Sequence, residues 1–266
     1  MKVLCPTDFS QASVAAARWA VQFVDSLGGG ELQLLHCLNV VSRSALFIKM
    51  DVVFRERAEE DLRILQTELD KLSDRVQLGA YVVNSDPQSF VPQHAAKHHF
   101  DFIVMGTKGL TALKDMTVGS VTAYLMDRSA VPLFVIPETA TFQNIQHLVL
   151  GVDSHQVKAE TIAPLKKLMQ ASGAKLTVVH ASLQDGLGID YDPLLNLPLE
   201  RTSYEFFTID QGESIPASLT AFCQERGGDL LVMVHRRRAW FERLFNNSVV
   251  KSKLFQIEMP LLVLPE

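Results

Sequence analysis

Short apolar runs alternate with longer helical patterns along the first half of the chain. Runs of this length, separated by helices, indicate βαβ units with right-handed crossovers and a parallel sheet. We expect strands near residues 2–7, 31–38, 77–83, 101–105 and 132–136. The helices between them are expected near residues 10–27, 48–74, 87–98 and 120–129, the third with Asp86 as its N-cap and Pro87 as its first residue.

The second half of the chain repeats this pattern. Asp101–Met105 (DFIVM) aligns with Asp229–Met233 (DLLVM) at an offset of 128 positions, and the register holds without a gap from about Ala80 to Glu138. Such a register indicates a tandem duplication. The second copy is expected to have strands near residues 147–152, 174–180, 204–210, 229–233 and 260–264, and an irregular loop over residues 181–202.

The predicted fold class is therefore α/β, with two tandem, doubly wound parallel-sheet domains of five strands each. Their expected limits are residues 1–139 and 146–266, with Thr139–Gln146 as the linker. At 266 residues and 47% hydrophobic content, the chain is long enough to form two such cores.

A glycine-containing turn follows the predicted strand at residues 101–105. It comprises Gly106, Thr107, Lys108 and Gly109, and Gly119 and Ser120 follow after nine intervening residues, at a predicted helix start. Glycine lets the main chain approach an anion without a Cβ in the way, and a helix N-terminus presents unpaired N–H groups. We therefore expect main-chain N–H groups to bind phosphate at this turn.

The spacing of these glycines resembles the nucleotide loop of the universal stress protein family, in its ATP-binding branch. The opening Val3–Ser10 (VLCPTDFS) is similar to the family's first strand and Pro-Thr-Asp turn, and Leu34–Cys37 (LLHC) is similar to its second strand. The resemblance implies a fold like that of the adenine nucleotide alpha hydrolases. It also implies that the first copy binds ATP, with AMP or ADP as alternatives and Mg²⁺ as an optional companion.

The implied nucleotide contacts are Pro6, Thr7, Asp8, Cys37, Met105, Gly106, Lys108, Gly109, Gly119, Ser120, Val121 and Thr122. Within this set, Asp8 and the main chain around Cys37 would contact adenine or ribose, and the glycines and the helix start would hold the phosphates. Two plainer alternatives stand beside this assignment. Asp8 would then be a helix N-cap, and the glycine turn would bind no ligand.

The second copy departs from the motif at each glycine. Val234, Arg237 and Asn247 replace the three glycines, and only Ser248 matches. A β-branched valine resists a positive φ, and arginine fills space that a phosphate needs. We therefore expect the second nucleotide site to be lost.

Three consecutive arginines, Arg236–Arg238, stand near Trp240 and Phe241 in the second copy. They form either an anion or partner site, or a solvated face whose aromatic neighbours lie in the core or an interface. The formal charge of −5 and the pI near 5.9 argue against a nucleic-acid binder, which needs a basic surface.

The remaining polar candidates are weaker. His94 and His98 are one helical turn apart, but neither a carboxylate nor a cysteine completes a metal set, so a solvated helix face is the favoured interpretation. Cys5 and Cys37 are either a disulfide or buried thiols, and buried thiols fit a reducing compartment. Without an apolar segment of membrane-spanning length, we expect a cytoplasmic protein without a membrane partner.

The function expected from the resemblance is ATP binding by a stress-response regulatory or signalling protein with an unidentified protein partner. No catalytic residue or metal ligand is assigned, and the nucleotide acts as a ligand without rapid turnover. One alternative is a slow Mg²⁺-dependent ATPase or nucleotidyl transferase using Asp8 and Ser120. The other is a ligand-free interaction module.

We predict that the two copies form a pseudo-dimer through their last strands, Pro132–Ile136 and Pro260–Leu264. Each strand is expected at a sheet edge with unpaired N–H and C=O groups, and the resemblance implies the same pairing in single-domain relatives. Copies separated within the linker should associate or aggregate in size-exclusion chromatography, and lysine at both Val135 and Val263 should separate them. A crystal structure with the two strands remote and solvent-exposed would contradict the pairing. A further homodimer is an additional expectation.

Overall fold

The structure of the protein is a computed structural model. It describes residues 1–38, 45–109, 118–152, 156–182, 197–200, 204–210, 215–235 and 257–266. The chain folds into two compact units and passes from the first to the second between Phe142 and Gln143.

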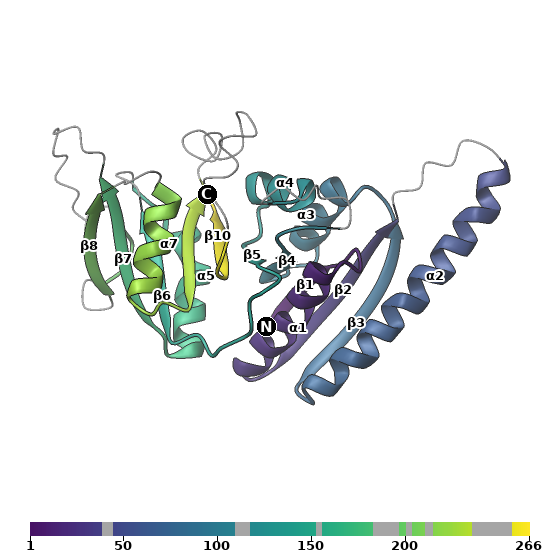
Figure 1. The fold of residues 1–266 in the computed structure, drawn as a ribbon, viewed down its shortest axis with the longest axis horizontal. Coiled ribbons are helices and arrows are strands. Elements are labelled where there is room, and N and C mark those ends of the chain that lie inside the picture. Colours follow the sequence, from purple (N-terminus) through teal and green to yellow (C-terminus); the bar gives the residue numbers. More distant parts are fainter. Residues whose placement is uncertain are drawn as a thin grey trace. The chain divides into compact units, whose positions relative to one another are not determined.

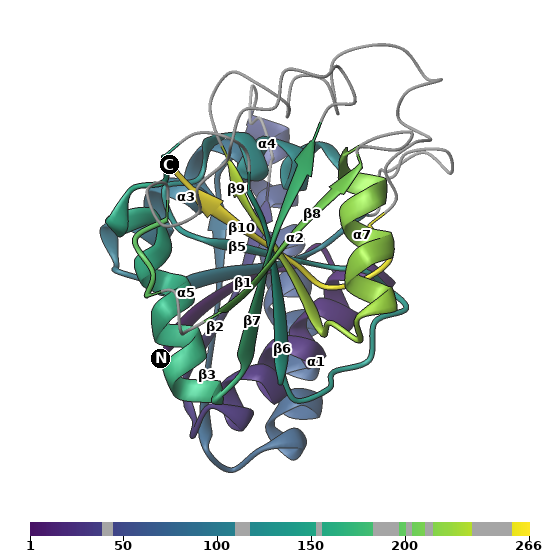
Figure 2. The same ribbon diagram turned by 90° about the vertical axis from the view of Figure 1, so that its left-hand side faces the viewer.

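Unit 1 is built on a parallel sheet with the strand order β3-β2-β1-β4-β5. Its strands are β1 (Lys2–Pro6), β2 (Gly30–Leu38), β3 (Val76–Asn84), β4 (Phe102–Gly106) and β5 (Leu133–Ile136). Its helices are α1 (Gln11–Ser26), α2 (Ala45–Leu69), α3 (Pro87–Lys97) and α4 (Ser120–Arg128), and a 3₁₀ turn at Asp70–Leu72 follows α2. Figures 1 and 2 show α1 and α2 on one face of the sheet and α3 and α4 on the other.

Helices on both faces explain why β4 is a continuous apolar run. All five of its residues are buried, as expected for a central strand of a parallel sheet. On the α1 side the core is aromatic: the ring centroids of Phe23 and Phe134 are 4.8 Å apart, and those of Phe102 and Phe134 are 5.1 Å apart. Trp19 extends this cluster to Phe142, whose ring meets it edge-on at 5.5 Å. The end of unit 1 is thereby held against α1.

Unit 2 has the corresponding strand order, β10-β9-β6-β7-β8, and its pairs are again parallel. Its strands are β6 (His147–Val152), β7 (Lys175–Ser182), β8 (Tyr204–Asp210), β9 (Leu230–His235) and β10 (Leu261–Pro265). Figure 2 shows α5 (Ala159–Ser172) and α7 (Ile215–Glu225) on opposite faces of this sheet. The predicted fold class, α/β with parallel sheets, is confirmed.

Both units fasten the start of the first strand to the start of the fourth with an aspartate. In unit 1 the Lys2 N–H donates to Asp101 Oδ2 at 2.8 Å. In unit 2 the N–H groups of Gln146 and His147 donate to Asp229 Oδ2 at 2.8 and 2.9 Å. Equivalent aspartates therefore accept a hydrogen bond from the first main-chain N–H of the first strand in both copies.

Most local expectations hold, and a few boundaries differ. Asp86 Oδ2 accepts the Ser89 N–H at 2.9 Å and Pro87 begins α3, which confirms that cap. Helix α2 begins at Ala45 and ends at Leu69, earlier at both ends than predicted. The loop expected from residue 181 was placed too early, because β7 continues to Ser182; residues 183–196 and 201–203 lie outside the described part. Among the described helices, none is long and apolar enough to cross a membrane.

A buried histidine should make stability depend on pH. His147 is 5% exposed, its Nε2 lies 2.8 Å from Thr177 Oγ1, and burial together with nearby Lys175 lowers its pKa. The unfolded chain then binds more protons than the folded one just below the ordinary histidine pKa of about 6.5, so stability falls as the pH drops through that range. His94, with a pKa also lowered by burial, acts in the same direction. Urea unfolding of His147→Gln should show a smaller loss between neutral and mildly acidic pH; an unchanged pH slope would contradict this.

Candidate functional site

The predicted nucleotide residues gather at the carboxyl ends of β1 and β4. Pro6 is the last residue of β1 and Gly106 the last residue of β4, and these strands are neighbours. The order β3-β2-β1-β4-β5 reverses direction between them, because β2 follows β1 on one side while β4 lies on the other. A switch point of this kind is where open α/β sheets bind ligands.

Asp8 lies in the turn that joins β1 to α1. Its Oδ1 accepts the Ser10 N–H at 3.1 Å. Ser10, not Asp8, caps the helix, because its Oγ accepts the Ser13 N–H at 3.2 Å. The N-cap alternative for Asp8 is therefore wrong: the carboxylate shapes the turn in front of the cap.

The three motif glycines have three different surroundings. A Cβ on Gly106 would lie 2.6 Å from the Ala12 carbonyl oxygen and 2.7 Å from its carbon, so β4 approaches the α1 backbone closely here. A Cβ on Gly109 would overlap Asp8 Oδ2. Gly119 is the N-cap of α4 at φ −69° and ψ 155°, and a Cβ there would be no nearer than 3.4 Å to its neighbours.

None of these glycines has a positive φ. The argument that the valine replacing Gly106 in the second copy would resist a positive φ therefore does not apply, because Gly106 itself does not have one. Gly106 is needed for close approach to α1, and Gly109 leaves space beside Asp8. At Gly119 the backbone is of a kind that any residue adopts.

Helix α4 begins next to this turn without a side-chain cap. The Gly119 N–H donates to the Thr107 carbonyl at 2.7 Å, which ties the helix start to the turn. The first-turn N–H groups of Ser120, Val121 and Thr122 have no intrahelical acceptor. Thr122 is buried and its hydroxyl donates to the Gly106 carbonyl at 2.9 Å, so among the three the exposed Ser120 hydroxyl is better placed for a ligand.

The other predicted residues lie around the same edge. Lys108 is half-buried, and its carbonyl oxygen is 3.5 Å from Ser10 Oγ. Met105 is buried in β4. Cys37, near the end of β2, is half-buried; burial, with a smaller contribution from Asp86, raises its pKa to about 12.

All three cysteines, Cys5, Cys37 and Cys223, are free. The disulfide alternative is therefore wrong. Burial raises the pKa of Cys5 to about 12 as well, so both thiols near the site stay protonated at neutral pH.

Sequence reasoning missed three residues that shape the turn: Phe9, His36 and the helix cap, Ser10. Phe9 has φ +64°, a backbone conformation that bulky side chains rarely adopt, and no pattern in the sequence signals it. His36 stacks on Phe9, with ring centroids 4.6 Å apart at 29°. The missed cap, Ser10, had a recognisable signal, because serine directly before an apolar helical pattern is a common N-cap.

The counterpart in unit 2 is only partly described. Val234 and His235 end β9 and are buried. The positions of Arg237, Asn247 and Ser248, and the cluster of Arg236–Arg238 with Trp240 and Phe241, lie outside the described residues. The loss of the second nucleotide site stays a prediction.

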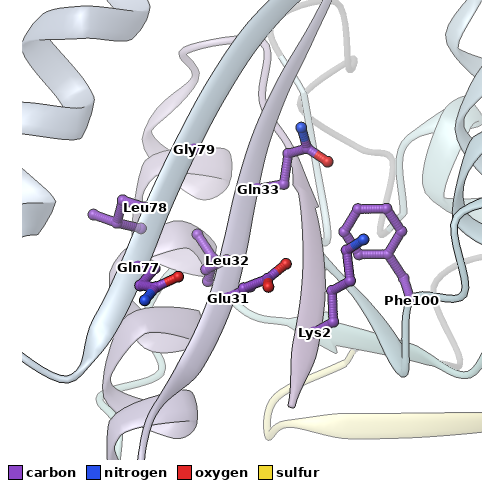
Figure 3. Close-up of a pocket in the computed structure, with 8 residues that line it drawn as sticks. All are labelled: Lys2, Glu31, Leu32, Gln33, Gln77, Leu78, Gly79 and Phe100. Atoms are coloured by element: carbon purple, nitrogen blue, oxygen red, sulfur yellow. The ribbon is translucent and has the colours of Figure 1, made fainter.

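Two further polar features lie away from the glycine turn. His94 Nε2 is 2.6 Å from the Tyr81 hydroxyl, and the described residues contain no group of three metal-ligating side chains. A hollow of about 350 Å³ lies at the amino ends of β1–β3 (Figure 3). Its Lys2 amine already donates to the His98 carbonyl at 3.2 Å and lies 4.7 Å from the centre of the Phe100 ring. This hollow is at the opposite end of the strands from the glycine turn.

Comparison with known proteins identifies relatives of this chain. The model of the Universal stress protein family matches residues 1–137, slightly more than half of the chain. Universal stress protein YxiE of Bacillus subtilis is 29% identical over 147 residues, which cover 51% of this chain and 97% of that protein. Universal stress protein MJ0577 of Methanocaldococcus jannaschii is 25% identical over 154 residues, covering 51% and 93%.

A solved structure is similar over nearly the whole chain. The crystal structure of a universal stress protein from Archaeoglobus fulgidus matches with a TM-score of 0.73 at 19% identity, covering 99% of this chain and 97% of that one. At this identity the match bears on the fold alone, and it agrees with the two-unit architecture.

Gly106 and Gly119 should respond differently to an added side chain. Gly106→Ala forces a Cβ against the Ala12 carbonyl and should lower the free energy of unfolding by about 1–3 kcal/mol. Gly119→Ser, where the backbone is ordinary and serine is a good N-cap, should change it by less than about 0.5 kcal/mol. Urea denaturation of both variants measures the difference, and equal losses would contradict the close-approach explanation.

Proposed function

We propose that this chain, which belongs to the universal stress protein family, binds one adenine nucleotide in its first domain, residues 1–139. ATP is the preferred ligand, with ADP and AMP as alternatives. The observation that carries this proposal is the contact between Asp8 and Gly109, where a Cβ would overlap Asp8 Oδ2. This contact brings Asp8, which is expected to bind the nucleoside, next to the glycine turn, which is expected to bind the phosphates.

The two ends of the nucleotide would use different kinds of group. Asp8 accepts hydrogen bonds from ribose hydroxyls, and the main chain at Cys37 faces the adenine. The phosphates rest on Gly109, Gly119 and the first-turn N–H groups of α4, where the helix dipole favours negative charge. Lys108 adds a cation at the same turn. A Mg²⁺ ion, where present, would be held by the phosphates.

The nucleotide acts as a regulatory ligand. The described part of the turn, Thr107–Gly109 with Gly119 and Ser120, contains no carboxylate or imidazole that would activate water. The enzyme alternative is a slow Mg²⁺-dependent ATPase or nucleotidyl transferase using Asp8 and Ser120. Mass spectrometry of nucleotide released from the purified, denatured protein separates the two: retained ATP, without product after long incubation, favours the regulatory ligand.

The second part of the proposal is that the chain binds a protein partner, and exposed apolar residues on α2 support it. Val52, Val53 and Phe54 are 53%, 61% and 45% exposed, and Figure 1 shows the amino-terminal part of this helix running clear of β3. Three consecutive exposed apolar residues are unusual on a helix that packs on a sheet. The ligand-free alternative would use this helix and Arg236–Arg238 without a nucleotide.

The second domain, residues 146–266, is proposed as a duplicated partner of the first that has lost its own nucleotide site. The two would associate within one chain as a pseudo-dimer. The free thiols fit a reducing compartment, and we place the protein in the cytoplasm, where it would couple nucleotide binding to a stress response.

The proposal predicts one nucleotide per chain. Gly109→Arg, which copies the residue at position 237, places a long side chain against Asp8 and should abolish ATP binding in isothermal titration calorimetry without unfolding the domain. Arg237→Gly is the matched control in the second copy and should leave the stoichiometry at one. Unchanged ATP affinity in Gly109→Arg would exclude the proposed phosphate site.

Asp8 is predicted to act on the nucleoside. Asp8→Ala should weaken ATP and adenosine binding by about 1–3 kcal/mol, as expected for the loss of a hydrogen-bonded carboxylate in a desolvated site. Asp8→Asn is the matched variant, because its amide oxygen still accepts the Ser10 N–H and so preserves the turn. Calorimetry and thermal unfolding should be run on both. A lowered Tm with unchanged affinity would show that Asp8 serves only the fold.

A further inference from the structure

We propose that His36 is a positioning residue for the nucleotide site, and that it acts by stacking on Phe9 and thereby fixing Asp8. This inference rests on the proposed function, since it assigns a role within the same site. It concerns the unusual backbone of the turn that carries Asp8 and the interactions that hold it.

The turn changes direction at Phe9. Its φ of +64° is costly for an aromatic residue and persists only where the surroundings hold it in place. The Phe9 N–H donates to Thr7 Oγ1 at 3.1 Å, which restrains the backbone on one side. Because of this conformation, the next residue, Ser10, reaches both Asp8 Oδ1 and the N-cap position of α1. The orientation of the Asp8 carboxylate therefore depends on Phe9.

His36 restrains the other side of Phe9. The two rings are stacked, with centroids 4.6 Å apart and an interplanar angle of 29°. Nδ1 of His36 lies 2.8 Å from the Thr7 carbonyl oxygen, so in this contact the ring nitrogen donates and the imidazole is anchored to the end of β1. An imidazole held in this way is a fixed surface for the Phe9 ring.

Comparison with unit 2 distinguishes the roles of the two His36 contacts, the hydrogen bond to Thr7 and the stack on Phe9. His180 lies at the equivalent place on β7, and its Nδ1 is 3.2 Å from the Val152 carbonyl oxygen. The residue corresponding to Phe9 in the second copy is Ser154, which has no ring. The hydrogen bond is thus common to both units, whereas the phenylalanine that takes part in the stack is present only in the first copy of the sequence. We therefore assign the positioning role to the stack and a scaffold role to the hydrogen bond.

Two substitutions at position 36 each remove one of these contacts and keep the other. His36→Asn retains a donor for the Thr7 carbonyl but removes the ring, and it should weaken ATP binding by roughly fivefold to tenfold. His36→Phe retains the ring without the donor and should recover most of the lost affinity. His180→Ala is the matched control, because it removes the common hydrogen bond in unit 2 and should leave ATP affinity unchanged. Thermal unfolding of every variant identifies a misfolded protein.

A double-mutant cycle tests whether His36 acts through Asp8. If it does, His36→Asn should weaken ATP binding much less in the Asp8→Ala background than in the wild type. Additive losses would show that His36 acts independently of Asp8 and would overturn the inference. Affinity retained in His36→Asn but lost in His36→Phe would show that the hydrogen bond, and not the stack, is what matters, and would overturn the inference as well.

Amide hydrogen exchange on the ligand-free protein gives a readout that does not need a nucleotide. The Phe9 and Ser10 amides should exchange faster in His36→Asn and stay protected in His36→Phe. A wild-type protein that binds no ATP, but shows this exchange pattern, would refute the proposed function while showing that His36 fixes the turn that carries Asp8. A wild type that binds ATP, with unchanged affinity and exchange in His36→Asn, would refute the positioning role alone.

Discussion

The close approach of β4 to the first turn of α1 is the constraint on which the candidate site depends. It is possible because Gly106 has no Cβ, which would otherwise lie 2.6 Å from the Ala12 carbonyl oxygen. Backbone cannot move away as a flexible side chain can, so this contact sets the separation between the end of β4 and the start of α1. Thr107, Lys108 and Gly109 follow directly, and their position beside Asp8 and Ser10 is a consequence of that separation.

Around this contact, polar groups of the two turns are used mainly to fix each other. Asp8 holds the Ser10 N–H, Ser10 caps α1, and the Thr7 hydroxyl lies 2.9 Å from Ser13 Oγ. On the other side Thr122 holds the Gly106 carbonyl and Gly119 holds the Thr107 carbonyl. The main-chain N–H groups at the start of α4 are left by helix geometry without internal acceptors. A hydrogen-bonded frame around donors that lack a partner within the helix is suited to binding an anion without rearrangement.

Much of this could be predicted from the sequence, because the signals are local. Apolar runs placed the strands to within a residue or two, and Asp86-Pro87 marked the start of α3. The glycine spacing and the Pro-Thr-Asp turn predicted one common sheet edge, and the structure places both at the carboxyl ends of β1 and β4. The errors concern interactions between segments far apart in the sequence. Gly106 was attributed to the approach of a phosphate and, through the valine that replaces it in the second copy, to a positive φ, whereas in the structure its absent Cβ makes room for the backbone of α1.

Phe9 is a second feature that the sequence alone does not predict. This phenylalanine has a positive φ, and its conformation is held by Thr7 and His36. Because His36 lies on the neighbouring strand, local sequence preferences do not predict this conformation. Comparison of the two units supplies what a single sequence pattern lacks. The aspartate ties at the strand starts and the histidine-to-carbonyl contacts occur in both units, so they are explained by the shared fold. The Phe9 ring and the three glycines are present in the first copy alone. A feature that is present in one copy and absent from the other, on the same scaffold, is not required by the scaffold, and this difference is the physical reason to connect it with the proposed nucleotide site.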